Sequence, residues 1–368
     1  MASTASIEIL DLRHFAATVL RPVLEAEGEL WKQRLHWDYR TSTRLLMQYL
    51  DSHMLPGYAA MESGQVTGYV FCVYEETKAV IGDVFALSPP AWANLGGALE
   101  EVRGELQDGG RESSGSAQPV QVSASVAQAS AHEIEEILLK HLFETLLNSP
   151  QLDRIESQLL LHPAGAHAAI FQKAGFEIFR RFFMVQQLQG IWNPPRVELP
   201  GGVELRPWRE EDLIPAGKLI SEAYRDHPDS LINDQYRSAH GSQRFLHNIV
   251  RYAGCGVFSA AVSHVVVEKS SRELVALVLG SRVSPQSGHI TQVCVHPRYR
   301  RRGLARMLLS VAAFHFMRHG ATEISLTVTE SNRHAIDLYR AEGYVCAHMF
   351  DATVWQRRGT GRGELRFP

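Results

Sequence analysis

Cysteine is scarce in this chain, and long apolar runs are missing. Its 368 residues include four cysteines, at positions 72, 255, 294 and 346. None of them stands in a CxxC or CxxH spacing, and four are too few for a disulfide framework in a chain of this length. No stretch approaches about 18 consecutive apolar residues, and the N-terminal residues lack the basic and apolar regions of a signal peptide. We therefore expect a cytoplasmic protein with no metal site and no membrane-spanning helix.

An excess of charge of one sign is also missing. The chain has 37 Lys and Arg residues against 40 Asp and Glu residues, a formal net charge of −3. No global charge attracts nucleic acid or an anionic membrane, so we expect neither as a partner. Apolar residues make up 45% of the chain and charged residues 21%, which is typical of a globular protein and excludes a disordered one. The arginines of the tail resemble an RGG-type nucleic-acid segment, but we interpret the tail as a frayed terminus.

Two stretches rich in Gly, Ser and Pro interrupt the pattern of apolar residues. The first, at about residues 104–130, predicts a long loop inserted in the first half of the chain. The second, residues 191–202, contains Pro194, Pro195 and Pro200 and is typical of a semi-rigid linker between domains. The length fits two domains of ordinary size. We predict a first domain at 1–190, a linker at 191–202, a second domain at 203–354 and an Arg/Gly-rich tail at 355–368.

The two predicted domains repeat one order of elements. Each begins with a short strand and a helical stretch, continues with a hairpin that ends at a Pro, and closes with a helix, a strand, a helix and a last strand opened by a Gly-aromatic pair. The hairpins end at Pro89 and Pro297, which are 208 residues apart. The last pairs begin at Gly175 and Gly343, which are 168 residues apart. The insertion accounts for much of this difference, so we interpret the chain as a duplicated α/β fold.

A basic turn in the second half connects a buried strand to a helix expected at residues 307–319. Gly303 allows the backbone to come close to a ligand, and Ala305 keeps the next turn thin. Unpaired N–H groups and the positive end of the helix dipole converge on such a turn, which predicts a binding site for an anion such as pyrophosphate. The spacing fits neither the GxxxxGK[ST] nor the GxGxxG phosphate loop. The arginines that supply charge there are Arg300, Arg301, Arg302 and Arg306.

Two motifs in this half resemble signatures of the GNAT N-acetyltransferase superfamily. The turn is similar to Arg/Gln-x-x-Gly-x-Gly/Ala and reads Arg300-Arg301-Arg302-Gly303-Leu304-Ala305. The second signature, Asn-x-x-Ala-x-x-Leu-Tyr-x-x-x-Gly-Phe/Tyr, is matched by Asn332, Ala335, Leu338, Tyr339, Gly343 and Tyr344. Both motifs lie at strand-to-helix junctions in the expected order. The resemblance covers residues 203–354, and the whole chain resembles tandem GNAT proteins such as the mycothiol synthase type, which implies two mixed-sheet α/β domains with flanking helices.

The resemblance implies acetyl-coenzyme A (acetyl-CoA) as the donor and an amine as the acceptor. In the superfamily the pantetheine arm pairs with one strand, which here carries Val293, Cys294 and Val295. The pyrophosphate lies in the turn, and the amide corresponding to Asn332 contacts the cofactor. The phenol corresponding to Tyr339 protonates the departing thiolate. Because transfer is direct, we interpret Cys294 as an apolar filler and not as a nucleophile.

The general base and the acceptor stay open. A water relay would need no base, and the candidate residues are Asp226, His227, Asp229, His289, Thr291, Gln292 and Glu330. The acceptor is expected to be a small-molecule amine, with a protein N-terminus or lysine as the alternative. A non-catalytic acetyl-CoA sensor or scaffold is the alternative of a different class. The oligomeric state also stays open.

The first half lacks the polar residues of both motifs. When the halves are aligned on Gly175 and Gly343, Phe171 stands in the place of the motif tyrosine and Ala164 in the place of the motif asparagine. No Arg/Gln-x-x-Gly-x-Gly/Ala turn follows Pro89. We therefore expect a degenerate first half that packs against the second or forms a wall of the acceptor pocket.

Overall fold

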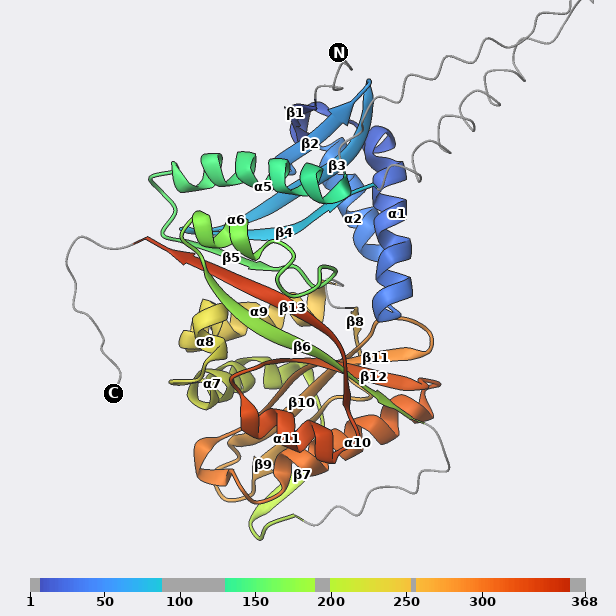
Figure 1. Cartoon of the computed structure of the whole chain (residues 1–368). Coiled ribbons are helices and arrows are strands. Elements are labelled where there is room, and N and C mark those ends of the chain that lie inside the picture. The colour runs from blue at the N-terminus through green and yellow to red at the C-terminus, as the bar shows by residue number, and fades with distance from the viewer. Residues whose placement is uncertain (1–6, 88–129, 189–198, 253–255, 358–368) are drawn as a thin grey trace, which may run out of the picture. The chain divides into compact units, whose positions relative to one another are not determined.

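The computed structural model describes residues 7–87, 130–188, 199–252 and 256–357. Nearly all of the predicted insertion, most of the predicted linker and residues 358–368 of the predicted tail lie outside these ranges. The chain packs as two units (Figure 1). Unit 1 consists of Met1–Glu27 and Leu45–Leu152, and unit 2 consists of Gly28–Arg44 and Asp153–Pro368.

Unit 1 contains a four-stranded antiparallel sheet in the order β1-β2-β3-β4. Its elements are β1 (Glu8–Asp11), η1 (Leu12–His14), β2 (Gly57–Glu62), β3 (Gln65–Glu75), β4 (Lys78–Ala86) and α5 (Ala131–Leu147), with the first part of α1 (Ala17–Leu35) and most of α2 (Arg40–Asp51). β3 is apolar and buried over most of its length, as expected for a central strand. A capping box of Ser130 and Glu133 begins α5, which packs its buried leucines on β2, β3 and β4.

The described part of unit 2 contains a mixed sheet of nine strands, eight of them in the order β5-β13-β6-β12-β11-β10-β9-β7 and the ninth, β8, paired to β10. The strands are β5 (Arg154–Gln158), β6 (Glu177–Gln187), β7 (Val203–Pro207), β8 (Val257–Phe258), β9 (His264–Glu268), β10 (Leu274–Arg282), β11 (Ser287–Val295), β12 (Glu323–Thr329) and β13 (Val345–Gln356). β11 and β12 pair in parallel, whereas the other neighbours along this path are antiparallel. The predicted mixed α/β fold with flanking helices is therefore confirmed.

The last strands of the two sequence repeats are exchanged within unit 2. β6, which ends the first repeat, pairs along the whole of β12. β13, which ends the second repeat, pairs along β5, and β6 and β13 pair with each other (Figure 1). Each final strand thus lies beside the penultimate strand of the other repeat. The sheet around β12 is completed by residues that precede the predicted linker.

Helices cover both faces of the unit 2 sheet. Because side chains alternate along a strand, β12 sends Leu326 and Val328 into a core with α10 and α11, and β6 sends Phe182 there. The opposite face of the sheet packs against α7 and α9 through β9, β10 and Cys294. Further along that opposite face, Phe183 packs with residues of Gly28–Arg44. The elements are α6 (Ala168–Lys173), η2 (Glu210–Asp212), α7 (Leu213–Ala223), α8 (Asp229–Ile232), η3 (Asp234–Arg237), α9 (Ala239–Arg251), η4 (Pro297–Tyr299), α10 (Leu304–Arg318) and α11 (Arg333–Ala341).

One predicted helix begins earlier than its apolar spacing indicated. α10 begins at Leu304, three residues before the expected start, and ends at Arg318. Leu304 is buried in the core, and Gly303 before it has a φ of 78°, a left-handed conformation that glycine adopts without steric cost. The turn therefore passes directly into the helix. Among the described residues, no helix combines the length and apolar character needed to cross a membrane.

Candidate functional site

The parallel strands β11 and β12 separate halfway along their length. They pair from Ser287 with Glu323 to Ile290 with Leu326, and no pairing follows. Beyond Ile290, β11 continues beside β10 to Val295, while β12 continues beside β6 to Thr329. A β-bulge in the β10–β11 ladder lies at the point of separation, where bulges bend a strand away from its partner. The gap exposes backbone edges of β11 that a ligand can pair with.

The turn between β11 and α10 presents unpaired backbone donors. Arg301 has a φ of 62° and Gly303 a φ of 78°. Among the described residues, the N–H groups of Arg301, Arg302 and Gly303 have no hydrogen-bond acceptor, and the first N–H groups of α10 have no preceding helical turn to bond to. No atom lies within 4 Å of the position that a Gly303 Cβ would take. The turn therefore has the donors, the dipole and the open space that a pyrophosphate requires.

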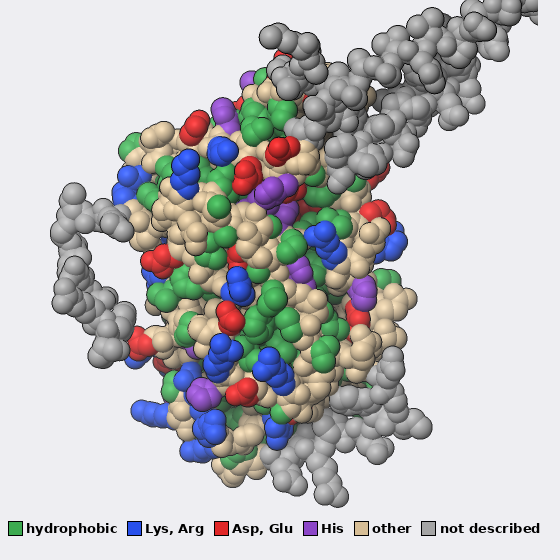
Figure 2. Space-filling model, viewed as in Figure 1, with side chains coloured by type: hydrophobic (Ala, Val, Ile, Leu, Met, Phe, Trp, Pro, Cys, Tyr) green, Lys and Arg blue, Asp and Glu red, His purple; other side chains and the backbone are tan. Residues whose placement is uncertain are grey.

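The arginines of the turn have different roles in the structure. Arg300 donates to the carbonyl of Ala223 at 2.6 Å, so it fastens the turn to the end of α7. Arg306 forms an ion pair with Glu342 at 2.7 Å, and the Arg302 guanidinium lies 5.1 Å from the ring centroid of Tyr299. Arg301 is exposed and has no ion pair among the described residues. Figure 2 shows Lys and Arg side chains most densely gathered over the lower part of the face in view, where Figure 1 places α10 and α11.

The separated strands, the turn and α11 surround one cavity of about 680 Å³. It brings together all but one of the predicted site residues, the exception being Arg302. Those that line it are Val293, Cys294, Val295, Arg300, Arg301, Gly303, Leu304, Ala305, Arg306, Asn332 and Tyr339. Of the candidate bases, His227, Asp229, His289, Thr291 and Gln292 line it, whereas Asp226 and Glu330 do not.

Tyr339 lies on α11 and is 7% exposed, with no hydrogen bond to its hydroxyl among the described residues. Burial raises the pKa of Tyr339 well above its ordinary value, and the charge of Asp229 raises it further. The phenol is therefore protonated at neutral pH and can donate a proton into the cavity.

Asn332 begins α11 and also contacts the loop before α8. Its Oδ1 accepts from the Ala335 N–H at 3.3 Å, which is an N-cap bond, and its amide nitrogen lies 3.2 Å from His227 Nε2. Burial lowers the pKa of His227. Asp229 accepts a hydrogen bond from the Thr329 hydroxyl at the end of β12. These contacts hold the loop against the carboxyl end of β12.

Two groups on β11 are buried and uncharged. His289 bonds Ser325 at 2.9 Å and lies edge-on to Trp37, and burial with the nearby Arg181 charge lowers its pKa to about 3. Such a weak base is a poor acceptor for an ammonium proton. Burial raises the pKa of Cys294 to about 12, so this thiol is not a nucleophile at neutral pH.

Two side chains from the first sequence repeat also line the cavity. Arg181 on β6 donates to Gln158 on β5 at 2.5 Å and to Thr327 on β12 at 3.3 Å. No local motif marks either of them, and they reach this cavity through the pairing of β6 with β12 and of β5 with β13. The other lining residues that sequence reasoning missed include Tyr224, Asn233, Tyr236, Phe245, Ile249 and His334. Tyr224 and Asn233 flank the segment that contains the candidate bases His227 and Asp229.

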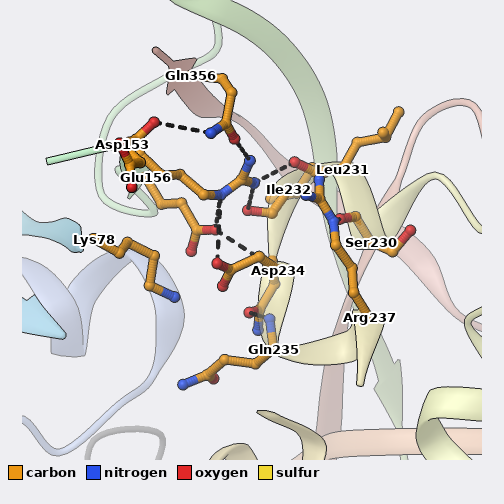
Figure 3. Close-up of polar contacts among 12 residues, drawn as sticks. Lys78, Asp153, Glu156, Ser230, Leu231, Ile232, Asp234, Gln235, Arg237 and Gln356 are labelled. Atoms are coloured by element: carbon orange, nitrogen blue, oxygen red, sulfur yellow. Dashed lines mark hydrogen bonds and ion pairs between the residues drawn. The ribbon is translucent and has the colours of Figure 1, made fainter. Parts of the chain in front are cut away.

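Arg154, which is buried, fastens this segment to the sheet, and Figure 3 shows its partners Glu156, Leu231, Ile232 and Gln356. Arg154 on β5 forms an ion pair with Glu156 at 2.5 Å and donates to the carbonyls of Leu231 and Ile232 in α8. It also donates to the Gln356 side chain at 3.0 Å. Glu156 in turn accepts from the Asp234 N–H at 3.2 Å. The segment with Asp229, Asn233 and Tyr236 is therefore anchored to β5.

Comparison with known proteins agrees with the two motifs. The GNAT acetyltransferase family model matches residues 223–344, which include β11, the turn, α10, β12 and α11. No curated protein matches the chain. A GCN5-related N-acetyltransferase from Sphaerobacter thermophilus is 15% identical with a TM-score of 0.58, and the match covers 96% of each chain.

Two further solved structures share the fold. A tandem GNAT protein from the clavulanic acid biosynthesis pathway is 14% identical with a TM-score of 0.54, over 97% of this chain and 100% of that chain. A glucosamine N-acetyltransferase region of a fungal multi-domain GH3 β-N-acetylglucosaminidase is 12% identical with a TM-score of 0.56, over 95% of this chain and 38% of that one. At such identities these matches show the fold alone. The match to the GNAT acetyltransferase family thus lies in the C-terminal half of the chain, and nearly the whole chain has the fold of tandem GNAT proteins.

Proposed function

We propose that this protein is an N-acetyltransferase that moves the acetyl group of acetyl-CoA to a small-molecule amine. The observation that carries the proposal is the meeting of three features in one cavity. These are the gap between β11 and β12, the donor-rich turn at Gly303 and the protonated phenol of Tyr339. A protein that only binds acetyl-CoA does not need a proton donor in this cavity, whereas acetyl transfer does.

The residues of this site suit each part of acetyl-CoA. The unpaired edge of β11 at Val293, Cys294 and Val295 suits the amide groups of the pantetheine arm. The turn from Arg300 to Arg306, with its free N–H groups and its cations, suits the pyrophosphate. Asn332 lines the cavity beside them. When bound, acetyl-CoA supplies a thioester whose carbonyl carbon accepts the amine and whose C–S bond then breaks.

The side chains of the chain itself handle protons and orientation in this proposal. Tyr339 holds a proton on its phenol oxygen, because burial keeps the phenol protonated. The phenol can therefore donate this proton to the sulfur as negative charge develops on the departing thiolate. Attack requires a neutral amine, whose proton leaves through a base or a water chain. Among the candidates, His227 before α8 and Asp229 at its first position line the cavity, and we leave the choice between them and a water relay open.

We further propose that the first repeat no longer binds the donor. Phe171, at the position of Tyr339, is 1% exposed and packs edge-on against Phe176 with ring centroids 5.1 Å apart. The segment after Pro89 lies outside the described residues. The first repeat instead contributes β5 and β6 to unit 2, and with them Gln158 and Arg181 to the cavity wall. A wall built from both repeats favours an enclosed small-molecule site over an open peptide groove.

A screen of primary amines with acetyl-CoA, read by release of free thiol, tests the proposal. We expect turnover with one chemical class of small amines and little with protein N-termini or lysine peptides. Turnover restricted to peptides would favour the protein acetyltransferase. Tight acetyl-CoA binding without turnover over the whole panel would overturn the proposal in favour of a sensor or scaffold.

A further inference from the structure

Arg181 is a cation of the cavity wall that has no carboxylate partner among the described residues. Arg181 forms no ion pair within 4.0 Å among the described residues. Its two hydrogen-bond acceptors, Gln158 and Thr327, are neutral, and its Nε is buried without a partner in this part of the chain. A guanidinium that is partly withdrawn from water without a counter-ion is costly, because buried charges are normally paired.

Arg181 lies on the side of the sheet away from the pyrophosphate turn. On β6 its neighbour Phe182 points into the core with α10 and α11, so alternation directs Arg181 to the opposite face. There it lies across from Thr329 on β12 and from Phe350 on β13, whose ring centroid is 5.9 Å from the guanidinium carbon. The turn leads directly into α10, which packs on the face opposite Arg181, so Arg181 lies apart from the turn that suits the donor phosphates.

The same side of the cavity carries the segment from Asp229 to Tyr236. Asp229 binds the hydroxyl of Thr329 there, and Asn233 and Tyr236 line the cavity from the same segment. Asp229 is more than 4.0 Å from the Arg181 nitrogens, since no ion pair joins them. The charge of Arg181 nevertheless acts on buried groups of the cavity. It lowers the pKa of His289, and it opposes the rise in the pKa of Tyr339 that burial and Asp229 cause. An anionic group in the cavity would find Arg181 as its counter-ion.

We propose that the acceptor is an amine that also carries a carboxylate, and that Arg181 binds this carboxylate. The inference rests on the proposed acetyl transfer and names its substrate class. The planar guanidinium fork suits a carboxylate because it can donate two parallel hydrogen bonds. Binding there fixes one end of the acceptor on β6 and directs its amine toward the gap between β11 and β12. Arg181 is thereby a residue that determines specificity and does not take part in proton transfer.

The test compares matched amines that differ only in this charge. Each amino acid of a panel is assayed against its primary amide, with acetyl-CoA and free-thiol release, in the wild-type protein and in Arg181→Gln, Arg181→Lys and Arg180→Gln. Arg180 is the control because it is adjacent and its side chain is 47% exposed. In parallel, calorimetry measures binding of acetyl-CoA alone, and of N-acetyl amino acids and N-acetyl amino amides in the presence of coenzyme A.

In the pair that is acetylated fastest, we expect the wild type to prefer the amino acid to its primary amide by at least about tenfold in kcat/KM. A hydrogen bond to a charged group contributes roughly this tenfold factor or more. In Arg181→Gln the preference falls toward one, Arg181→Lys keeps part of it, and Arg180→Gln keeps it fully. The affinity for acetyl-CoA stays within about twofold in all variants.

Equal or better transfer to the amides by the wild type overturns the inference and leaves the acetyltransferase intact. A loss of acetyl-CoA affinity in Arg181→Gln that matches the loss of activity also overturns it, because the charge would then serve the donor. If no amine is acetylated, the proposed function fails. In that case, binding of the N-acetyl amino acids that depends on Arg181 would still support a carboxylate site. If they do not bind, or bind equally well in Arg181→Gln, the carboxylate site is rejected.

Discussion

At the scale of single residues, Tyr339 and Tyr344 form a matched pair. Both are buried, their ring centroids are 5.8 Å apart, and the Tyr344 hydroxyl has no hydrogen-bond partner in the described residues. Only Tyr339 lines the cavity. We expect Tyr339→Phe to lower kcat about 10²-fold or more, the usual contribution of a general acid, with little change in acetyl-CoA affinity. Tyr344→Phe should keep most of the activity, and equal losses in the two variants would contradict the acid role.

His289 makes the stability of the fold depend on pH. Burial, with the Arg181 charge, lowers its pKa from 6.5 to about 3, so between these values the unfolded chain binds a proton that the folded chain does not. Stability therefore falls as the pH falls through this window, by up to roughly 1.4 kcal/mol per pH unit.

Urea unfolding across the acidic range measures this slope. We expect His289→Gln to reduce it by about the contribution of one proton, and the same change at His240, which is exposed on α9, to leave it unaltered. A slope that His289→Gln does not reduce would show that the imidazole titrates near its ordinary pKa in the folded protein.

At the scale of elements, the turn before α10 can be tested with two glycines of the same conformation. Gly303 and Gly320 have φ values of 78° and 87°, and a Cβ on either meets no atom within 4 Å. A Trp at either position therefore has a similar backbone cost. We expect Gly303→Trp to abolish measurable acetyl-CoA binding by filling the turn, while Gly320→Trp at the far end of α10 retains it. Calorimetry measures the affinity of both variants for acetyl-CoA. If Gly303→Trp retains this affinity, the turn is not the pyrophosphate site.

The Arg154 anchor gives a second test at this scale. Arg154→Met removes the guanidinium from Glu156, which is 7% exposed, and from two carbonyls of α8. Breaking a buried ion pair costs about 3–5 kcal/mol, whereas Arg251→Met should cost about 0–1 kcal/mol because the Arg251–Glu210 pair is more than half exposed.

Hydrogen exchange and kinetics separate a local effect from general destabilisation. In Arg154→Met, we expect faster amide exchange in α8 and η3 and a higher KM for the acceptor, with an unchanged acetyl-CoA affinity. Faster exchange spread evenly over unit 2 would contradict a role in positioning the loop.

The sequence was informative where a residue and its partners lie close together in the chain. Gly303, Asn332 and Tyr339 stand in two short motifs, and the strand, turn and helix around each motif form locally. Arg181 and Gln158 could not be predicted, because they reach the cavity only through pairing with β12 and β13, more than a hundred residues further along. The early start of α10 was missed because it depends on the left-handed Gly303 and not on apolar spacing.

At the scale of the whole molecule, the exchange of β6 and β13 decides which parts of the chain can fold. A fragment of residues 199–357 lacks β6, so β12 and β13 lose the strand that lies between them. We expect this fragment to aggregate or to show no cooperative thermal transition. A fragment of residues 153–357 keeps β5 and β6 and should show one. It will be less stable than the whole chain, because it lacks the contacts of Trp37 with Phe183. Cooperative unfolding of the shorter fragment would contradict this expectation.

The repeat itself explains why the exchange could not be read from the sequence. The final strands of both repeats follow a Gly-aromatic pair, at Gly175 and at Gly343, and both have the strand pattern that the penultimate strands require. Pairing within a repeat and pairing between repeats therefore satisfy the same local rules. The choice depends on the geometry of the assembled sheet, which no short window of residues contains.

The exchange of β6 and β13 also constrains how this gene can change. After an ordinary duplication, a copy that loses its activity is free to be deleted. Here, deletion of the first copy would remove the strand that lies between β12 and β13, and with it the Arg181 side of the cavity. The first copy, which we propose no longer binds the donor, is thus needed for the fold of the second, and the two copies can be inherited only together.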